Sequence, residues 1–416
     1  MSETFVVVGG GLAGAKTVEA LRERDFSGRI ELICEEESPP YERPPLSKEY
    51  LAGRAEVSDL TVHPREWYSE HDVELRLGTR ATGVHPGSHE VELADATRLG
   101  YDKLVLATGS RPRRLPLPGA DSRGVHCLRR LGDADRLAAT LRRVDRLVIV
   151  GAGWIGLEVA AVAREYGVGV HVVEAAHQPL LEALGPRMGE FFAELHREHG
   201  VELHLSARVA EVLTSSGVTG VRLTDGSELP ADAVLLAVGA RPELTLAETA
   251  GLDVDNGVLV DTGLTTSDPD ILAVGDIADL RHPTFGRLRV EHWANALKQP
   301  AVAAATMLGH SASFTELPYF FTDQYDLGME YHGFVPGEVE DRVVVRGSLA
   351  DRRFVACWLD GSDRVLAAMN VNVFGQNERI RTLIHSGASV VPERLADTTY
   401  SLDDVDALRK RPVGSA

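Results

Sequence analysis

The sequence predicts an α/β protein with two doubly wound units, each built on a parallel sheet, and a C-terminal α+β domain. Three observations lead to this fold class. Residues 5–35 read as strand, Gly-rich turn, helix and strand, and residues 147–174 repeat that order. From residue 317 onward this alternation stops, and short apolar runs separated by turn residues take over. We therefore expect two parallel sheets followed by a differently built domain.

The first Gly-rich turn has the spacing of a dinucleotide-binding loop. Gly9, Gly11 and Gly14 follow the apolar run 5–8, and Glu35 ends the second apolar run. In this context the first glycine permits a tight turn, the second lets the backbone approach a pyrophosphate, and the third allows close helix packing. The helix N-terminus offers free N–H groups to that anion. A Gly-rich turn without a ligand is the alternative for any single motif of this kind.

A second loop of the same form argues against that alternative. Gly151, Gly153 and Gly156 repeat the spacing, and Glu174 ends the strand that follows the helix. A carboxylate there accepts hydrogen bonds from the ribose of NAD and repels the 2′-phosphate of NADP. No Arg or Lys follows until Arg187, so no cation is ready to bind that phosphate. We predict a second site, specific for NADH.

The similarity between the two repeated segments extends beyond the Gly-rich loops. Residues 104–112 and 234–242 each form an apolar run that ends in Gly-x-Arg-Pro. A repeated unit that opens with a dinucleotide loop and closes with this turn predicts two Rossmann-type dinucleotide-binding domains.

Composition limits the remaining function classes. A chain of 416 residues is expected to form two or three domains, and 44% apolar with 25% charged residues is typical of globular proteins. A net charge of −19 argues against general nucleic-acid binding. No apolar run is long enough for a transmembrane helix, and the first strand follows Met1 so closely that we expect no signal peptide. Three cysteines are too few for a disulfide framework and indicate a cytoplasmic protein. We find no metal-ligand motif and expect no metal site.

The segments between these motifs have their own signals. Residues 36–48 contain two Pro-Pro pairs, which predict either an exposed loop or a rigid frame that holds Arg43 and Lys48 against a cofactor. Residues 66–91 read as a helix followed by short strands, and residues 115–119 as a linker. An apolar strand ends at Asp276, at the sheet edge where α/β proteins bind ligands.

The C-terminal third completes the element prediction. A helix is expected from residue 291 to Met307, with Pro300 interrupting or kinking it. Strands are expected at 343–345, 354–358 and 365–373, and a helix at 377–383. Between Arg281 and Lys298 the chain is locally basic, which indicates either a solvated loop or a docking surface for an acidic protein.

Taken together, these motifs resemble those of FAD-dependent ferredoxin reductases, which serve bacterial cytochrome P450 and Rieske dioxygenase systems. The resemblance rests on the two loops, on residues 41–48 (Tyr-Glu-Arg-Pro-Pro-Leu-Ser-Lys), on the strand ending at Asp276 and on residues 318–324. Apoptosis-inducing factor shares the pattern. The resemblance implies a glutathione reductase-like fold, with a split FAD-binding domain (1–112 and 243–316), an NAD-binding domain (113–242) and a C-terminal α+β domain (317–416).

The resemblance also implies the roles of individual residues. Lys48 and Glu158 would set the charge near the reacting atoms, although a solvated helix carboxylate is the alternative for Glu158. The residues implied in FAD binding are Gly9, Gly11, Ala13, Gly14, Glu35, Arg43, Lys48, Ala81, Thr108, Gly109, Arg129, Asp276 and Trp293. Those implied in NADH binding are Gly151, Gly153, Ile155, Gly156, Glu158, Glu174 and Gly239.

The cysteine pattern decides between activities of this architecture. Disulfide reductases pass electrons from the flavin to a cysteine pair, but residues 36–51 contain no cysteine, and Cys34 ends a buried strand. We therefore expect hydride from NADH to reach FAD and single electrons to leave to an iron–sulfur ferredoxin that feeds a P450 or Rieske oxygenase, the activity of a ferredoxin–NAD(+) reductase. An NADH oxidase that forms peroxide and a redox-sensing binding protein similar to apoptosis-inducing factor remain as alternatives.

Overall fold

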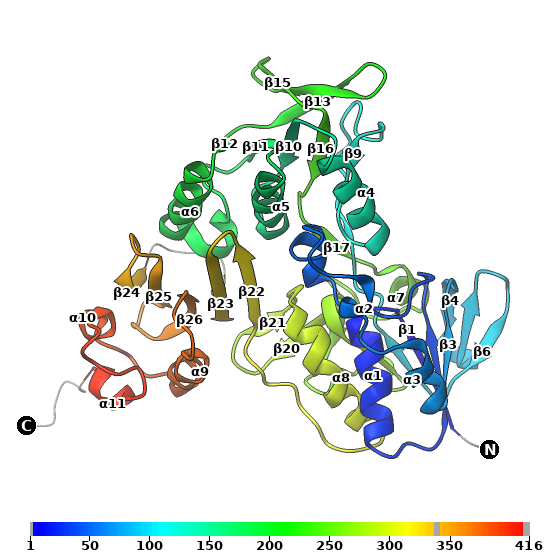
Figure 1. Ribbon diagram of the computed structural model, residues 1–416. Coiled ribbons are helices and arrows are strands. Elements are labelled where there is room, and N and C mark those ends of the chain that lie inside the picture. The colour runs from blue at the N-terminus through cyan, green and yellow to red at the C-terminus, as the bar shows by residue number, and fades with distance from the viewer. Residues whose placement is uncertain (1–2, 337–341, 411–416) are drawn as a thin grey trace, which may run out of the picture. The chain divides into compact units, whose positions relative to one another are not determined.

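The computed structural model describes residues 3–336 and 342–410, which form two compact units (Figure 1). Each unit combines segments that are distant in the sequence. The first unit comprises the described residues of Met1–Pro45, Ala55–Arg111 and Ala240–Pro318, and the second those of Leu46–Arg54, Pro112–Gly239 and Tyr319–Ala416. The Pro-rich segment is thus divided, since Arg43 lies in the first unit and Lys48 in the second.

A five-stranded parallel sheet forms the centre of the first unit. Its strand order is β19-β7-β1-β2-β3. The strands are β1 (Thr4–Val8), β2 (Arg29–Ile33), β3 (Val73–Arg76), β7 (Lys103–Leu106) and β19 (Ile271–Ala273). Helix α1 (Leu12–Glu23) packs against β1, β2 and helix α8 (Trp293–Met307). Since the apolar residues of these strands are almost fully buried, the sheet forms the core that positions the loop after β1.

Smaller elements surround this core. An antiparallel sheet contains β4 (Ala81–His85), β5 (Glu90–Leu93) and β6 (Arg98–Gly100), and a mixed sheet contains β18 (Val258–Val260), β20 (Ala278–His282) and β21 (Gly286–Leu288). The short helices are α2 (Val57–Leu60), α3 (Arg65–Glu70) and α7 (Thr245–Thr249). Strand β8 (Ser110–Pro112) pairs with β17 (Ala240–Pro242), so the two Gly-x-Arg-Pro turns lie side by side.

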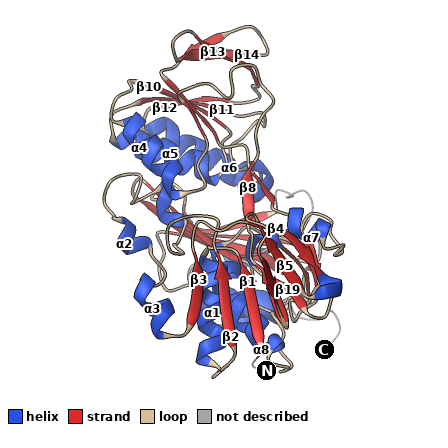
Figure 2. Cartoon of the chain, turned by 90° about the vertical axis from the view of Figure 1, so that its right-hand side faces the viewer, coloured by secondary structure: helices blue, strands red, loops and turns tan. Residues whose placement is uncertain are grey.

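The second unit contains the other parallel sheet, with strand order β12-β11-β10-β16-β9. The strands are β9 (Val125–His126), β10 (Arg146–Val150), β11 (Gly169–Val173), β12 (Val201–His204) and β16 (Ala233–Leu236). Helices α5 (Trp154–Glu165) and α6 (Leu181–Glu198) lie on one side of this sheet, and β13 (Val209–Thr214), β14 (Val218–Leu223) and β15 (Glu228–Pro230) lie on the other (Figure 2). Helix α4 (Leu131–Leu141) precedes β10.

The C-terminal part of the second unit is an antiparallel sheet with order β22-β23-β26-β25-β24. It consists of β22 (Tyr319–Gln324), β23 (Leu327–Gly333), β24 (Val343–Ser348), β25 (Arg353–Leu359) and β26 (Val365–Val371), with helices α9 (Asn377–Ser386), α10 (Pro392–Ala396) and α11 (Val405–Leu408). The strands and the helix expected in this region are therefore confirmed, as is the fold class.

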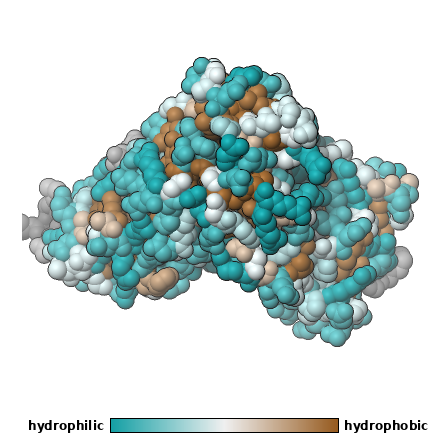
Figure 3. Space-filling view, turned by 45° about the horizontal axis from the view of Figure 1, so that its top comes forward, coloured by the Kyte–Doolittle hydropathy of each residue, from teal (hydrophilic) through white to brown (hydrophobic). Residues whose placement is uncertain are grey.

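Two further expectations concern chain continuity and the surface. Helix α8 runs without a break through Pro300, so an interruption there is wrong. Among residues 3–336 and 342–410, no helix is both long and apolar enough to cross a membrane. The face shown in Figure 3 is mainly hydrophilic, with apolar residues in separate patches.

Candidate functional site

The fold requires glycine at only two of the three glycine positions of the first loop. Gly9 has φ = +139°, and a Cβ there would lie 2.1 Å from the carbonyl oxygen of Ala107. A Cβ on Gly14 would lie 1.9 Å from the Gly9 carbonyl oxygen. Gly11 has an ordinary extended conformation (φ = −103°), and its Cβ would meet no atom within 4 Å. Folding thus requires glycine at the first and third positions, whereas the second leaves open space beside the backbone.

The second loop repeats this division. Gly151 has φ = +104°, and a Cβ there would lie 2.4 Å from the carbonyl oxygen of Ala237. A Cβ on Gly156 would lie 2.2 Å from the carbonyl oxygen of Gly151. Gly153 has φ = −80°, and its Cβ would again meet nothing within 4 Å. In each loop the middle glycine, Gly11 or Gly153, therefore borders open space that the packing of the protein does not explain. We call this open space beside the backbone a cradle.

Both cradles open at the start of a helix. Gly11 is the N-cap of α1 and Gly153 the N-cap of α5, and neither helix has a side-chain cap or an acidic residue in its first turn. The first N–H groups of a helix lack intrahelical acceptors and carry positive potential. A cradle beside such a helix end fits a diphosphate. The loop of each unit therefore fits the diphosphate of a dinucleotide, which the sequence leads us to expect to be FAD in the first unit and NADH in the second.

Glu174 lies at the end of β11, beside the second loop. Its Oε2 accepts a hydrogen bond from the backbone N–H of Ala152 at 2.7 Å, and its Oε1 accepts one from that of Ala176 at 2.8 Å. A carboxylate has about four acceptor positions, so two stay available for ribose hydroxyls. The two backbone bonds fix the orientation of the carboxylate before a nucleotide arrives.

Glu35 in the first unit is partly exposed. Its side chain is 38% exposed, and the Nε of Arg80 lies 4.0 Å from its Oε1. Sequence reasoning missed Arg80, which stands directly before β4 and belongs to no recognisable motif. A carboxylate this accessible can accept hydrogen bonds from a ribose, with a cation beside it.

The Pro-rich segment supplies a polar cluster within the first unit. Arg43 donates to Oε1 of Glu36 at 3.0 Å and to the Tyr41 hydroxyl at 3.3 Å, and it interacts electrostatically with Asp276. Trp293, the first residue of α8, donates its indole N–H to Glu42 at 3.0 Å. Since its indole N–H is already used by the protein, Trp293 can offer a ligand its ring alone.

The remaining residues implied in cofactor binding have different positions. Thr108 donates its hydroxyl hydrogen to the Glu243 carbonyl at 2.9 Å, and Gly109 and Gly239 both have positive φ, which explains glycine there by backbone conformation. Ala13 is buried in α1, and the Cβ of Ala13 would lie 3.2 Å from a Cβ on Gly275. Ala81 begins β4, Ile155 is an exposed apolar residue in the first turn of α5, and Arg129 precedes α4.

The structure brings Lys48 and Glu158 together in the second unit. The Lys48 Nζ lies 3.1 Å from Oε1 of Glu158, and the two side chains are only 7% and 6% exposed. Ser47 donates to Oε2 of Glu158, and Thr322 of β22 donates to Oε1 at 2.6 Å. Lys48 also lies 5.5 Å from the centre of the Phe321 ring. Glu158 is therefore a buried, paired carboxylate, so the solvated helix face considered as its alternative is wrong.

Ser47 and Thr322 are functional candidates that sequence reasoning missed. Ser47 stands beside Lys48, and Thr322 lies in the stretch 318–324 that supported the family resemblance. Behind Thr322 the polar contacts continue, because Gln324 donates to its hydroxyl at 3.2 Å and contacts the ring of His196 at 2.9 Å. Glu158 thus stands at the end of a buried polar chain.

The set of residues expected around FAD is divided between the units. Lys48 and Arg129 belong to the second unit, and the rest of the set belongs to the first.

Cys34 is fully buried beside the first loop, where a Cβ on Gly10 would lie 2.8 Å from its Sγ. Burial raises the pKa of the Cys34 thiol to about 12. Since the thiolate is the reactive form, Cys34 is a packing residue.

The basic stretch before α8 is less available than its sequence indicates. Arg287 donates to the carbonyls of Val260 and Asp279, at 3.1 and 2.8 Å. The Arg289 side chain is only 9% exposed and pairs with Glu291. The guanidinium groups of Arg287 and Arg289 therefore hold the mixed sheet and its flanking loop together, whereas Arg281 is exposed.

Comparison with known proteins identifies the family. Residues 3–300 match the sequence model described as pyridine nucleotide-disulphide oxidoreductase, and residues 319–405 match the one described as reductase C-terminal. The chain is 38% identical to rhodocoxin reductase of Rhodococcus erythropolis, over 96% of this chain and 93% of that protein. It is 40% identical to the ferredoxin–NAD(+) reductase component of the anthranilate 1,2-dioxygenase system of Burkholderia cepacia, over 96% and 98%.

A solved structure agrees with these relatives. The covalent putidaredoxin reductase–putidaredoxin complex matches with a TM-score of 0.92 at 37% identity, over 97% of this chain and 98% of that chain. The similarity therefore extends over both units and over the C-terminal sheet, and it confirms the resemblance found in the sequence. This chain belongs to the pyridine nucleotide-disulphide oxidoreductase family.

Proposed function

We propose that this chain is an NADH-dependent ferredoxin reductase that carries FAD and passes single electrons to an iron–sulfur ferredoxin of a cytochrome P450 or Rieske oxygenase system. Its relatives include reductase components of dioxygenase systems and putidaredoxin reductase. The observation that carries the proposal is the pair of cradles at Gly11 and Gly153. A chain with two such cradles has room for two dinucleotides, which a hydride transfer between NADH and FAD requires.

The two cofactor sites are assigned as follows. In the first unit, the loop around Gly11 holds the diphosphate of FAD, Glu35 accepts from its ribose, and Arg43, Asp276 and Trp293 complete the site. In the second unit, the loop around Gly153 holds the diphosphate of NADH, and Glu174 accepts from its adenosine ribose. The further members of the two sets are Gly9, Ala13, Gly14, Lys48, Ala81, Thr108, Gly109 and Arg129 for FAD, and Gly151, Ile155, Gly156, Glu158 and Gly239 for NADH.

The chain contributes electrostatics and positioning to the reaction. When bound, FAD accepts an electron pair as hydride and releases electrons singly, which suits a one-electron iron–sulfur carrier. Lys48 and Glu158 form the charged pair of the reaction centre. Ser47 and Thr322 donate to the two Glu158 oxygens and hold the carboxylate in one orientation, so that its charge does not have to reorganise during the reaction.

The absence of a reactive thiol separates this activity from disulfide reduction. Residues 36–51 contain no cysteine, and Cys34 is buried with a raised pKa. Electrons therefore leave to an external acceptor. All three cysteines are free, and their number supports a cytoplasmic location. We also propose the domain division 1–112 with 243–316, 113–242 and 317–416.

Glycine variants test the cofactor assignment. A valine at Gly11 extends into open space, so the Gly11→Val protein should fold but lose FAD, measured as flavin absorbance per polypeptide after gel filtration. Gly153→Val should keep FAD and lose NADH binding. Gly9→Ala is the comparison, because its Cβ would collide with the Ala107 carbonyl and prevent folding. A Gly11→Val protein with a full complement of FAD would refute the assignment.

Turnover assays test the activity itself. NADH-dependent reduction of a [2Fe–2S] ferredoxin should be much faster than oxygen uptake in the absence of ferredoxin. Rapid oxygen consumption without a carrier would identify an NADH oxidase instead. A long-lived coloured complex with NADH and slow turnover with every ferredoxin would identify a redox-sensing protein.

A further inference from the structure

Three side chains outside the proposed reaction centre meet on neighbouring strands of the second unit. His171 lies on β11, and Glu202 and His204 lie on β12. The Nδ1 atom of His171 is 3.2 Å from Nε2 of His204 and 3.5 Å from Oε2 of Glu202. All three ligand atoms lie within 4.8 Å of one another.

The parallel register explains why they meet. His171 is paired with Glu202, and Val173 is paired with His204. Since alternate residues of a strand point to the same face, His171, Glu202 and His204 share the face of Val173. Val173 packs in the apolar cluster that includes residues of β13 and β14, on the side opposite α5 and α6. The three polar side chains lie at the edge of the sheet, because β12 is its edge strand.

Two of the three separations match the edge of a coordination tetrahedron. Zinc binds imidazole nitrogen at about 2.0–2.1 Å and carboxylate oxygen at about 2.0–2.2 Å, so the distance between two ligand atoms is roughly 3.3–3.5 Å. The two observed separations are 3.2 and 3.5 Å. Hydrogen bonding alone explains the cluster less well, because Nδ1 of His171 carries at most one hydrogen and faces two partners.

We propose that His171, Glu202 and His204 form a binding site for a divalent transition-metal ion, for which zinc is the best fit. Two imidazoles with one carboxylate suit zinc and cobalt(II), and they leave a fourth position for water. The Glu202 side chain is 71% exposed, so an ion can enter from solvent. This site revises the expectation from the sequence that the chain holds no metal.

A bound ion would join the edge strand to its neighbour. The two strands are otherwise connected by their backbone ladder, which continues from the His204 carbonyl to the N–H of Glu174 at 2.9 Å. The ion would therefore strengthen the edge of the sheet immediately before the carboxylate assigned to the NADH ribose. Because ligands that bind the folded state alone stabilise it, zinc should also raise the melting temperature.

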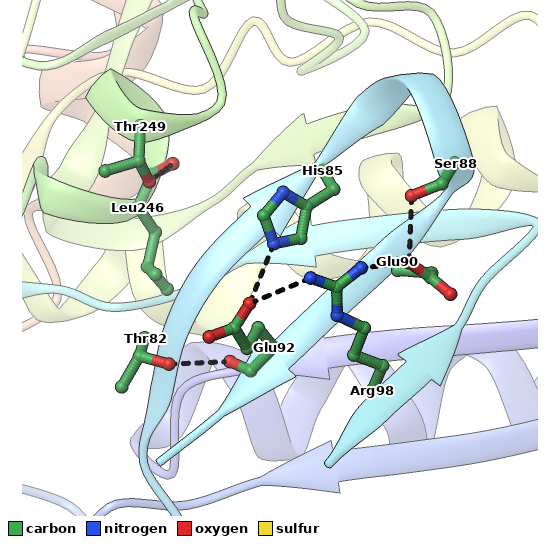
Figure 4. Close-up of polar contacts among 8 residues, drawn as sticks. All are labelled: Thr82, His85, Ser88, Glu90, Glu92, Arg98, Leu246 and Thr249. Carbon is green, nitrogen blue, oxygen red and sulfur yellow. Dashed lines mark hydrogen bonds and ion pairs between the residues drawn. The ribbon is translucent and has the colours of Figure 1, made fainter. Parts of the chain in front are cut away.

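A histidine–glutamate pair in the first unit provides a matched control. His85 lies 3.0 Å from Oε2 of Glu92, as Figure 4 shows. In contrast to the proposed site, it has one imidazole, and the guanidinium of Arg98 shares Glu92 at 3.4 Å (Figure 4). Because the Glu92 carboxylate is already paired with the Arg98 guanidinium, the His85–Glu92 pair is not expected to bind zinc.

The experiment uses the full FAD-loaded chain without a histidine tag. Equilibrium dialysis against zinc should give one tightly bound ion per chain, and cobalt(II) should produce the visible absorption of a tetrahedral site. Glu202→Gln and His204→Gln should each weaken zinc affinity by at least roughly tenfold. Since Glu202 is exposed, its variant should keep the fold, as measured by flavin content and circular dichroism.

His85→Gln should bind zinc as the unchanged protein does. The proposal fails if the unchanged chain binds no stoichiometric zinc. It fails equally if Glu202→Gln and His204→Gln bind zinc with unchanged affinity, or if His85→Gln loses as much affinity as they do. Because the readouts are metal content, absorption and melting temperature, the outcome does not depend on the proposed reductase activity.

Discussion

The hydroxyl of Thr322 donates to Oε1 of Glu158 over 2.6 Å and thereby connects the C-terminal sheet to the buried ion pair of Lys48 and Glu158. Glu158 has three donors, Lys48, Ser47 and Thr322, which leave its carboxylate little freedom to rotate. The C-terminal domain is thus part of the charged centre of the second unit.

Removing the Thr322 hydroxyl should destabilise the protein. Thr322→Val keeps the shape but leaves a buried carboxylate oxygen and the Gln324 amide with one partner fewer. We expect a loss of about 1–3 kcal/mol in the free energy of unfolding, measured by urea denaturation of the FAD-loaded chain. Thr322→Ser keeps the hydroxyl and should therefore retain most of the free energy of unfolding that Thr322→Val loses. Thr82→Val, at an exposed threonine with a weak 3.3 Å contact, is the control and should change little (Figure 4).

Neutralising Glu158 should cost more than removing one hydroxyl. Glu158→Gln keeps one of the two acceptor oxygens that Ser47 and Thr322 use, and it leaves the Lys48 ammonium buried without a counter-charge. The expected loss is about 3–5 kcal/mol, and Lys48→Met in the same chain should recover part of it. For the exposed pair of Arg54 and Glu165, Glu165→Gln should cost less than about 1 kcal/mol. Equal losses for the two glutamates would show that the Lys48 pair is solvated.

His196 should make stability depend on pH. Its pKa is lowered from 6.5 to about 4, mainly because burial disfavours the charged imidazole. The hydrogen bond to Gln324 opposes this lowering of the pKa, and the nearby His199 adds to it. Because the unfolded state then binds more protons between these values, the contribution is complete above pH 6.5 and is lost as the pH falls toward 4. The total is about 3 kcal/mol. Urea midpoints at several pH values should show this slope, and His196→Gln should lack it.

Glu174 should decide between the two nicotinamide nucleotides. The unchanged chain is expected to prefer NADH over NADPH by at least about tenfold in kcat/KM, or about 1.4 kcal/mol. Replacing Glu174 by Ala together with Ala175→Arg should reduce that ratio, mainly through the KM for NADPH. Glu182→Ala, on α6 of the same unit, should leave the ratio unchanged. Equal rates with both nucleotides in the unchanged chain would contradict the ribose assignment.

Docking of the ferredoxin should be tested without Arg287 and Arg289, whose guanidinium groups bind backbone carbonyls of the protein. Arg289 also pairs with Glu291. Reversing the charge of these two arginines should therefore lower the melting temperature, and this loss of stability would obscure any effect on docking. Arg281 is exposed, so Arg281→Glu is the cleaner variant. If this surface steers an acidic ferredoxin, Arg281→Glu should raise the KM for ferredoxin at low salt and leave dichloroindophenol reduction unchanged. An unchanged KM would place docking elsewhere.

The sequence by itself determined the features that depend on local spacing. Alternating apolar runs and glycines at fixed intervals predicted both parallel sheets and both loops, because a strand, a tight turn and a helix start are set by residues close in the chain. The missing cysteine between residues 36 and 51 likewise excluded a disulfide mechanism without any structure.

Only the tertiary structure decided which distant side chains meet. Thr322 is 164 residues from Glu158, and no local pattern could assign it to that carboxylate. His171 meets Glu202 and His204 because of a strand register that periodicity does not specify. The structure also showed that Arg289 is nearly buried, since a charge count along the chain cannot tell a solvated guanidinium from one that holds the backbone. Long-range pairing is a property of the packed core, which fixes these contacts after the local elements have formed.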